Sequence, residues 1–395
     1  MSDDYVKQLH RMFGASAEAR RLFERIAETP AAKRAEILAD VNRLKRIAGL
    51  SYALMALYRQ QVNSGFVLGD PVEIERTNCK TILDPNTGIT FRVQWNPHRE
   101  LRKNHSLLAE HNIISLKVDE TRLINKGEDG RACYLCKTNI DEQNPGEILL
   151  GIELAGELFY AGANFSYITN NHFTVMNGEH RPQQYRREIA RILNDFVEKT
   201  AGCFRAVFNG RAGASILWHE HIQATTEAFP IEQIRIEDEH IVHEGGDVRV
   251  SRPDYYIPVW VIEGRDKERL EAATHGIVES WHRLNRDEHT ENIIVAGSGD
   301  RYRVFVILRD GKKLSAGRAG KKGAPAAFET GGNIILSYEP ASGVNDVNER
   351  HTFESASLET VRELLEEISP ERQSCDYLLK ILTSKDSAGV FCRDR

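Results

Sequence analysis

The sequence predicts an α+β protein, with two blocks of antiparallel sheet and packed helices that follow an N-terminal helical segment. Apolar residues recur at helical spacing over the first 65 residues. Strand-like segments and amphipathic helices then occur twice, in residues 66–234 and 253–395, on either side of a polar stretch. At 395 residues the chain is long enough for two or three domains. We therefore expect a helical segment over 1–65, a chemistry-bearing half over 66–234 and a second half over 253–395.

Composition limits the classes of function. Lys and Arg number 52 against 58 Asp and Glu, and the net charge of −6 argues against a protein that coats nucleic acid. The sequence contains no run of 18 apolar residues, so it predicts no membrane-spanning helix. The acidic start, Met1-Ser2-Asp3-Asp4, is not followed by the apolar stretch of a signal peptide. Six cysteines do not make a disulfide scaffold. We predict a cytoplasmic protein that binds neither nucleic acid nor membrane.

The N-terminal segment carries two apolar stripes. Leu22, Phe23 and Ile26 form the first, and residues 37–47 carry the second at i, i+3 and i+4 spacing. Each helix therefore has one apolar face. Such faces predict a helical layer that packs on a sheet, in preference to a separate module.

The first block alternates strands with one clear helix. Phe91, Val93 and Trp95 alternate with polar residues, which is typical of a strand with one buried face. Apolar residues recur every three or four positions over 185–197 and predict an amphipathic helix. We expect the other strands of this block over 148–154, 173–176, 203–208 and 218–223.

The second block follows a polar segment, 235–252, whose charges and adjacent Gly245 and Gly246 predict a linker. Pro258 places the next strand at an edge or a strand start. We expect strands over 256–262, 293–295, 304–308 and 334–336, and helices over 270–284 and 358–368, the latter capped by Ser357.

The densest chemical signal is His219-Glu-His-Ile-Gln223. Alternate histidines on an extended segment point to the same face. Main-chain N–H groups of the preceding small-residue loop, 209–215, can cradle a phosphate, and the neutral imidazole of His221 can attack phosphorus. Gln223 can donate a hydrogen bond to a phosphoryl oxygen without acting as an acid. We interpret this motif as a phosphate-chemistry site, against the alternative of a strand with two surface histidines.

Cys133 and Cys136 form a CxxC pair. The pair could be half of a zinc site, a redox pair or a coincidence. Zinc would need two histidines from elsewhere, and His180 and His219 are the candidates. A redox pair belongs at a strand-to-helix turn, and the residues from Lys137 onward are a poor helix start. The spacing therefore favours structural zinc.

Basic and histidine clusters give weaker signals. His98, Arg99 and Arg102 follow the strand at 91–95 and could meet an anionic substrate, because arginine contacts phosphate in a bidentate manner. His275 and His282 lack a carboxylate partner at metal spacing, and we expect both on the surface.

The loop 311–323 is rich in Gly, Ala and basic residues, and we expect a solvated loop in preference to a phosphate-gathering lid. Its basic residues are Lys312, Lys313, Arg318, Lys321 and Lys322.

Four segments, in this order, resemble the transferase branch of the histidine-triad superfamily. That branch includes galactose-1-phosphate uridylyltransferase, dinucleoside tetraphosphate phosphorylases and GDP-hexose phosphorylases. The segments are Pro97-His-Arg-Glu-Leu-Arg102, Cys133-Tyr-Leu-Cys136, Val175-Met-Asn-Gly-Glu-His180 and the stretch from Asn209 to Gln223. Residues 164–175 with 180–183 are also similar to an uncharacterised bacterial domain family of this superfamily. Glu220 stands where the uridylyltransferase motif has proline.

The resemblance implies the site residues and a fold of two histidine-triad-like blocks. His221 would be the nucleophile and Gln223 its partner in catalysis. Zinc (Zn²⁺) would be held by Cys133, Cys136, His180 and His219. The substrate would be bound by Arg99, Arg102, Asn164, Asn209, Gly213, Ala214 and Ser215.

The resemblance also implies the reaction. We expect a nucleotidyltransferase or phosphorylase that forms a covalent nucleotidyl-histidine. Its substrate would be a nucleoside diphosphate sugar or a dinucleoside polyphosphate, and its acceptor phosphate or a sugar phosphate. Hydrolases of the superfamily carry a third histidine where this chain has Gln223, which favours transfer over hydrolysis. A homodimer is one assembly that the resemblance suggests. A non-catalytic nucleotide-binding regulator and a CxxC redox protein are the alternatives.

Overall fold

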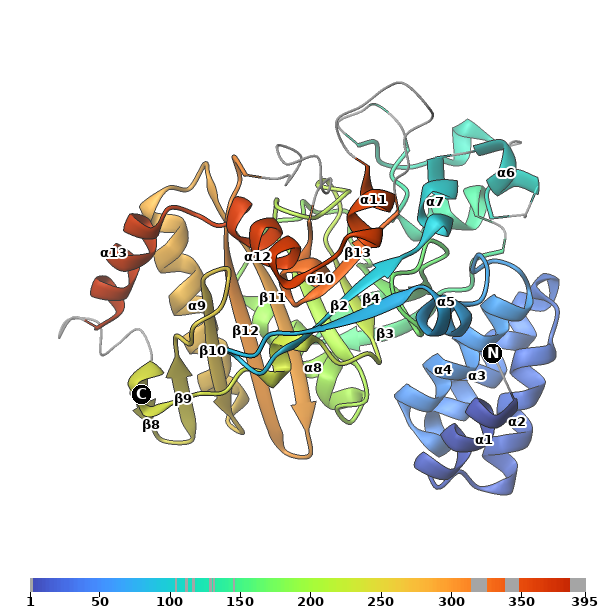
Figure 1. The fold of residues 1–395 in the computed structure, drawn as a ribbon. Coiled ribbons are helices and arrows are strands. Elements are labelled where there is room, and N and C mark those ends of the chain that lie inside the picture. The colour runs from blue at the N-terminus through green and yellow to red at the C-terminus, as the bar shows by residue number, and fades with distance from the viewer. Residues whose placement is uncertain are drawn as a thin grey trace.

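The computed structural model describes residues 3–103, 105–110, 113–115, 118–127, 130, 132–144, 146–313, 325–337 and 348–383. A ten-stranded antiparallel sheet runs through the centre of the molecule (Figure 1). In spatial order its strands are β3 (Leu150–Leu154), β4 (Glu157–Ala163), β5 (Phe173–Asn177), β7 (His221–Thr225), β6 (Arg205–Asn209), β11 (His289–Ser298), β12 (Arg301–Asp310), β10 (Val259–Gly264), β9 (Val248–Ser251) and β8 (Ile241–Gly245).

The sheet consists of two halves that meet edge to edge. Strands β3 to β7 supply one half and β8 to β12 the other, and β6 pairs with β11 between Val207 and Ile294 at their junction. Each half carries one long helix on the same face, α8 (Glu188–Lys199) and α9 (Lys267–Leu284), and the two helices pack on each other. The structure thus confirms the predicted α+β class, with one continuous sheet through both blocks.

A second, three-stranded sheet lies against the opposite face. It consists of β1 (Cys79–Leu83), β2 (Thr90–Trp95) and β13 (Asn333–Leu336), and β13 runs parallel to β2. A separate apolar core joins Phe91 and Val93 of β2 to Ile294 and Phe305 of the large sheet. Because β13 comes from the second predicted block, the two blocks share this layer. The helices near it are α10 (Ala327–Thr330), α11 (Glu349–Glu354) and α12 (Leu358–Glu367), the last capped by Ser357 as predicted.

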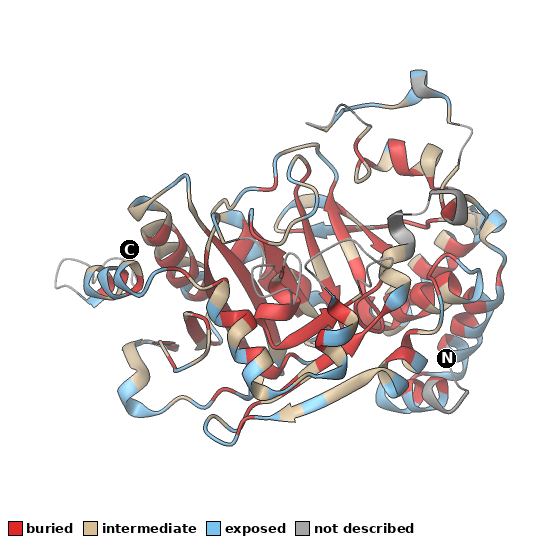
Figure 2. Cartoon of the chain, turned by 45° about the horizontal axis from the view of Figure 1, so that its top comes forward, coloured by how far each residue is buried: buried red, intermediate tan, exposed pale blue. Residues whose placement is uncertain are grey.

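Four N-terminal helices pack beside the first half of the sheet (Figure 1). They are α1 (Asp3–Met12), α2 (Ala17–Glu28), α3 (Arg34–Ala48) and α4 (Leu50–Asn63). Helix α4 is buried along most of its length, and Tyr58 contacts Phe173 of β5 with ring centroids 5.6 Å apart. Ser51 Oγ donates to the carbonyl of Thr200, 2.6 Å away, just after α8. The apolar faces of this segment therefore join the main core, which Figure 2 shows as a continuous buried interior.

The expected linker is wrong. Within residues 235–252, β8 and β9 pair with each other across Gly245 and Val248, and β9 continues the large sheet next to β10. Gly246 makes the tight turn between them with φ +62°. Strands β8 and β9 are short and rich in charge, as edge strands that avoid aggregation often are. This composition resembles that of a linker in the sequence.

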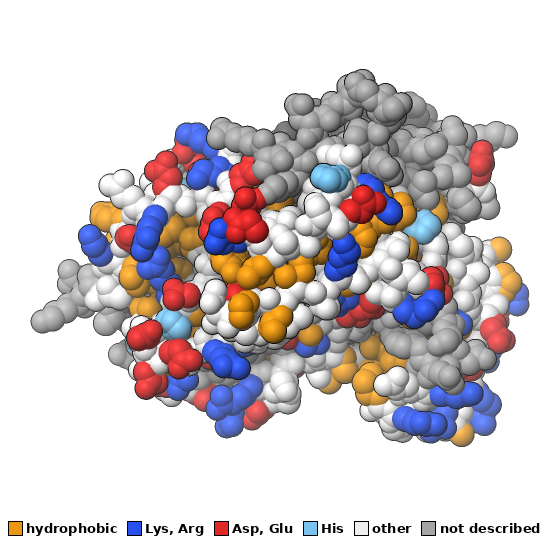
Figure 3. Space-filling view, in the orientation of Figure 1, with side chains coloured by type: hydrophobic (Ala, Val, Ile, Leu, Met, Phe, Trp, Pro, Cys, Tyr) orange, Lys and Arg blue, Asp and Glu red, His pale blue; other side chains and the backbone are white. Residues whose placement is uncertain are grey.

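Smaller elements complete the description. They are α5 (Pro71–Thr77), α6 (His105–Glu110), α7 (Lys137–Gln143), α13 (Arg372–Thr383) and the 3₁₀ turns at Ala31–Lys33, Pro97–Lys103, Glu120–Arg122, Pro230–Gln233 and Asp238–His240. Charged side chains of both signs are interspersed over the face drawn in Figure 3. Among the helices described here, none combines the length and the apolar run that a membrane crossing needs.

Candidate active site and metal centre

One face of β5 and β7 forms the floor of a pocket of about 840 Å³. Thr174 is paired with Gln223 and Met176 with His221, so these four side chains point to the same side. The alternate residues, including Val175 and Ile222, are fully buried in the core below α4 and α8. Side chains alternate along β7, so His221 and Gln223 face the pocket and Ile222 faces the core.

The pocket brings together five of the predicted site residues. These are Arg99, Asn164, Ser215, His221 and Gln223. Its walls are both polar and apolar, and residues from the 115–147 region close one side. An enclosure of this size and mixed lining suits a small-molecule ligand of nucleotide dimensions.

His221 is held with one ring nitrogen bound and the other available. Its Nδ1 lies 2.9 Å from the carbonyl oxygen of His219, so this nitrogen carries the proton and donates. Nε2 then has the lone pair on the side of the pocket. The ring is 6% exposed, and burial lowers its pKa to about 4, so the imidazole is neutral at physiological pH. A neutral imidazole with a free nitrogen is a nucleophile.

The main chain of His221 is clamped by Gln183. Its Oε1 accepts from His221 N at 2.7 Å, and its Nε2 donates to the carbonyls of His221 at 3.0 Å and Asn209 at 2.8 Å. Gln183 is 1% exposed. This single amide therefore ties β7 to the end of β6. Sequence reasoning missed its role, although its place three residues after His180 was a signal.

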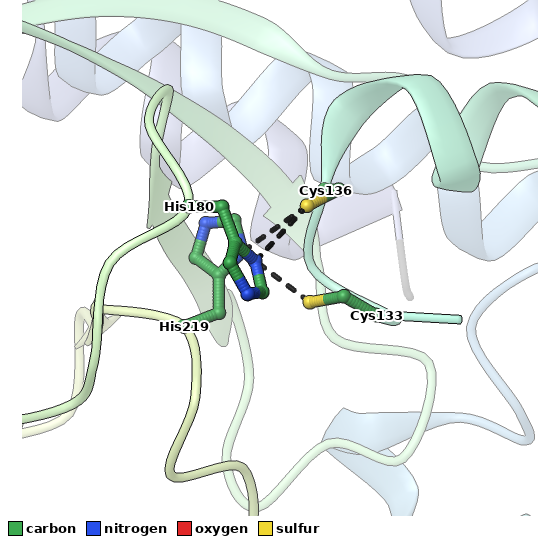
Figure 4. Close-up of side chains that lie close together, drawn as sticks. All are labelled: Cys133, Cys136, His180 and His219. Atoms are coloured by element: carbon green, nitrogen blue, oxygen red, sulfur yellow. Dashed lines mark hydrogen bonds between the residues drawn. The ribbon is translucent and has the colours of Figure 1, made fainter. Parts of the chain in front are cut away.

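Cys133, Cys136, His180 and His219 gather beside the pocket (Figure 4). Nδ1 of His219 lies 3.3 Å from Cys133 Sγ and 3.6 Å from Cys136 Sγ, and His180 Nδ1 lies 3.3 Å from Cys136 Sγ. A tetrahedral zinc with bonds of about 2.3 Å to sulfur and 2.0 Å to nitrogen sets such atoms roughly 3.5 Å apart. All four ligand atoms lie within 4.8 Å of one another. The donor set and its spacing fit one zinc ion.

The surroundings of the cluster favour metal binding. Nε2 of His219 lies 2.8 Å from the carbonyl oxygen of Asn177, which turns Nδ1 toward the cysteines. Hydrogen bonds from Cys136 and His219 lower the pKa of Cys133 and favour its thiolate, the form in which cysteine binds metals. One expectation is wrong: Lys137 does begin a helix, α7, with Cys136 as its N-cap. The two histidines at the sulfur atoms, and not the lack of a helix, distinguish the site from a redox pair.

His219 and His221 do not share a face. Strand β7 begins at His221, and His219 lies in the preceding loop, from which it faces the cysteines while His221 faces the pocket. The expectation that alternate histidines point the same way is therefore wrong, because the segment is not yet extended at His219.

Glu220, the residue that stands in place of proline, is fully buried and points away from the pocket. Arg186 binds both of its oxygens, with Nε 2.7 Å from Oε2 and Nη2 2.8 Å from Oε1. Asn177 Nδ2 donates to the same carboxylate at 2.8 Å, and Glu157 binds the other side of Arg186. The ion pair between Glu220 and Arg186 therefore holds the motif on the side away from the pocket, at the position where the related motif has proline.

Several predicted substrate contacts lie elsewhere. Asn209 is 2% exposed, and its Oδ1 accepts from Asn292 Nδ2 at 3.0 Å and from Ala327 N at 2.8 Å. Gly213, with φ +105°, packs against Ala326, and Ala214 does not line the pocket either. These three residues shape the loop without facing the site, because the loop turns back onto α10 before Ser215. Their contact with substrate stays a prediction.

The basic residues are divided. Arg99 lines the pocket and its Nη1 donates to the carbonyl of Ser166 at 2.6 Å. The side chain of Arg102 lies outside the described residues, as do Arg318, Lys321 and Lys322 of the basic loop. His98 is half-buried against Gly69.

The two helix histidines expected on the surface are half-buried, and both contact other side chains. His275 stacks on Tyr185 with ring centroids 6.1 Å apart, and His282 Nε2 lies 2.6 Å from the buried carboxylate of Glu291. Tyr185 precedes α8 and Glu291 lies on β11, so the spacing of residues within α9 could not predict these contacts.

Residues 72–226 match the family described as a domain of unknown function, DUF4922. Galactose-1-phosphate uridylyltransferases are curated relatives. That of Streptococcus pneumoniae is 24% identical over 201 residues, which cover 47% of this chain and 39% of the relative. That of Clostridium acetobutylicum is 27% identical over 184 residues, 43% of this chain and 36% of the relative. The chain thus matches well under half the length of these relatives.

Among solved structures, yeast Ap4A phosphorylase Apa2 in complex with AMP aligns with a TM-score of 0.44 and 13% identity, over 79% of this chain and 96% of that one. The sequence relatives and the DUF4922 match support a relationship of this chain to the transferase branch of the histidine-triad superfamily. Residues 72–226, which match DUF4922, contain the pocket floor and all four residues of the Cys/His cluster.

Proposed function

We propose that this protein transfers a nucleotidyl group through a covalent intermediate on His221. The observation that carries the proposal is the His221 ring itself, whose Nδ1 is bound to the His219 carbonyl while Nε2 faces the pocket. The Nε2 lone pair attacks the α-phosphorus of the bound substrate. A P–N bond forms, the P–O bond to the leaving sugar phosphate or nucleoside polyphosphate breaks, and the leaving oxygen keeps the electron pair.

The second half of the reaction returns the enzyme to its starting state. An oxygen of the acceptor attacks the same phosphorus, the P–N bond breaks, and its electrons return to Nε2. Gln223 has no proton to exchange at neutral pH, so it is poorly suited to activate water. The covalent nucleotidyl-histidine then persists until an anionic acceptor binds. Transfer to phosphate or to a sugar phosphate is therefore favoured over hydrolysis.

The phosphoryl oxygens need donors as negative charge develops. Gln223 supplies an amide on the same face as His221, and Arg99 supplies a guanidinium at the pocket wall. Ser215 lies on the loop just before the motif and also lines the pocket. Asn164 lies there too, although its side chain already contacts Thr174 Oγ1 and Ser166 N.

Zinc at Cys133, Cys136, His180 and His219 would have a structural part, because four protein ligands complete a tetrahedral site. When bound, it would hold the loop before β7 through His219. The His219 carbonyl, two residues before the nucleophile, then keeps a fixed place for Nδ1 of His221.

The proposed substrates are nucleoside diphosphate sugars or dinucleoside polyphosphates. The uridylyltransferase relatives support this class, as does a pocket large enough for a nucleotide. The boundaries at 1–65, 66–234 and 253–395, a homodimer and a cytoplasmic location stay predictions.

Turnover tests the proposal. The protein is incubated with GDP-, UDP- and ADP-hexoses or a dinucleoside tetraphosphate, with either phosphate or a hexose 1-phosphate, and products are separated by ion-exchange chromatography. We expect transfer with one acceptor and ping-pong kinetics. Saturable binding without turnover would favour the regulator. Titratable, disulfide-forming thiols at Cys133 and Cys136 without bound metal would favour the redox protein.

A further inference from the structure

His172 lies in the pocket wall, and neither the motifs nor the proposed reaction gives it a role. It directly precedes β5, two residues before Thr174, the partner of Gln223 across the strands. Residues two apart on a strand share a face, so His172 is the diagonal neighbour of Gln223. The side chain is fully buried, and its ring packs on Phe328 with centroids 5.3 Å apart.

The proton position on His172 follows from its neighbours. Its Nδ1 accepts from the main-chain N–H of Ile168 at 3.0 Å, so Nδ1 is unprotonated and Nε2 carries the hydrogen. Burial, together with the charge of Arg99, lowers the pKa of His172 to about 3. The ring is therefore neutral at all ordinary pH values, with one fixed tautomer, and is not suited to move protons.

Nε2 of His172 is shielded from solvent and makes no hydrogen bond within the described part of the chain. The side-chain amide of Gln223 interacts with the ring and by itself raises the pKa of His172, which burial and Arg99 lower. A buried N–H without a partner is destabilising, and a turn of the Gln223 side-chain carbonyl toward it would supply that partner. Gln223 itself is partly exposed to the pocket.

We infer that His172 is the positioning residue for Gln223: its Nε2–H holds Gln223 Oε1 and thereby turns the Gln223 NH₂ group toward the phosphoryl oxygens. Without this contact the amide is free to rotate by half a turn and present its oxygen to the phosphate, which repels it. The inference deepens the proposed function and rests on it. It assigns His172 no proton transfer and no contact with the reacting phosphorus.

A double-mutant cycle tests this role. Single-turnover rates of nucleotidyl loading are measured for the wild type, His172→Leu, Gln223→Ala and the double variant. We expect Gln223→Ala to slow loading about 100-fold, as for loss of one oxyanion donor. We expect His172→Leu to slow it about 10- to 100-fold, with KM changed less than kcat. The double variant should be no slower than Gln223→Ala within about twofold.

Controls separate positioning from folding. His172→Gln retains an N–H donor and should recover part of the rate lost in His172→Leu, whereas His240→Leu replaces a half-buried histidine of the turn before β8, outside the pocket lining, and should load normally. Melting temperatures of all variants identify damage to the fold. Independent, multiplying losses in the double variant would overturn the inference, and so would normal loading by a folded His172→Leu.

A second measurement does not depend on activity. Protein labelled with ¹⁵N only in histidine is examined by NMR, and the His172 signals are identified by their loss in His172→Gln. We expect a neutral ring protonated at Nε2, with an Nε2 signal that shifts in Gln223→Ala. A ring protonated at Nδ1, or an Nε2 signal indifferent to Gln223, would overturn the contact. If the wild type loads no nucleotide while the NMR result holds, the proposed function fails and the contact stands.

Discussion

Nδ1 of His221 lies 2.9 Å from the carbonyl oxygen of His219, so a residue of the Cys/His cluster directly orients the pocket imidazole. The side chain of His219 faces the cysteines and its main chain faces His221. His219 therefore contacts both the cysteines of the cluster and the proposed nucleophile.

Metal content is the first prediction. We expect one zinc per chain by elemental analysis, and loss of that zinc in Cys133→Ser. Removal of zinc should lower the free energy of unfolding by about 4 kcal/mol when free zinc is a thousandfold above its Kd. Cys203→Ser, a half-buried thiol outside the cluster, is the matched control. Full zinc occupancy in Cys133→Ser would contradict the ligand assignment.

The ion pair behind the motif gives the second prediction. Arg186→Met leaves the buried carboxylate of Glu220 without its cation, which should cost about 3 kcal/mol in the free energy of unfolding. Glu220→Gln in the same chain should restore part of that loss, because the uncompensated charge is gone. Denaturant unfolding of the two single variants and the double variant measures this. Simple additivity of the single losses would show that the two residues are not coupled.

The third prediction concerns pH. Burial alone would lower the pKa of His282, but its hydrogen bond to Glu291 outweighs burial and raises the pKa above the usual 6.5. Folding therefore favours protonated His282. The resulting stability is fully present below about pH 6.5 and is lost as pH rises through the folded-state pKa.

Melting temperatures of the wild type and His282→Gln, measured from pH 5.5 to pH 9, check this dependence. The stabilising difference should be greatest at the acid end and should shrink toward pH 9. A difference that grows with pH would mean that the ring is held neutral.

Gln183 gives the fourth prediction. Gln183→Ala removes three hydrogen bonds to the main chain of His221 and Asn209. We expect nucleotidyl loading to slow about tenfold, because misplacement of a nucleophile by a fraction of an ångström is costly. Nucleotide affinity, measured by calorimetry, should change much less. A pure loss of affinity at an unchanged loading rate would place Gln183 in binding instead.

Sequence reasoning found what periodicity and motif spacing encode. The paired strands β11 and β12 and the helices α8 and α9 follow from patterns local to each segment, whereas the full Cys/His cluster followed from the resemblance. It failed where a residue's role depends on a distant partner. The hydrogen bonds of Asn209 to Asn292 and Ala327 were not predictable from the sequence, and neither was the pairing of Glu220 with Arg186.

The layer that contains β2 and β13 shows the same limit at the level of the fold. Pairing of Val93 with Ile334 joins segments more than 200 residues apart, and no local pattern predicts such a contact. The charged strands β8 and β9 were likewise recognisable only by the neighbours that complete their hydrogen bonds. Local chemistry was therefore predictable, whereas the second layer and the edge of the sheet were not.

The central claim is a covalent bond between His221 and a nucleotidyl group, and intact-protein mass spectrometry tests it most directly. The protein is incubated briefly with each candidate nucleotide substrate and without any acceptor. We expect an added mass of one nucleoside monophosphate, absent in His221→Ala and retained in His351→Ala, an exposed histidine on α11. An unmodified wild type with every substrate, in protein that binds zinc, or an adduct that persists in His221→Ala, would contradict the account.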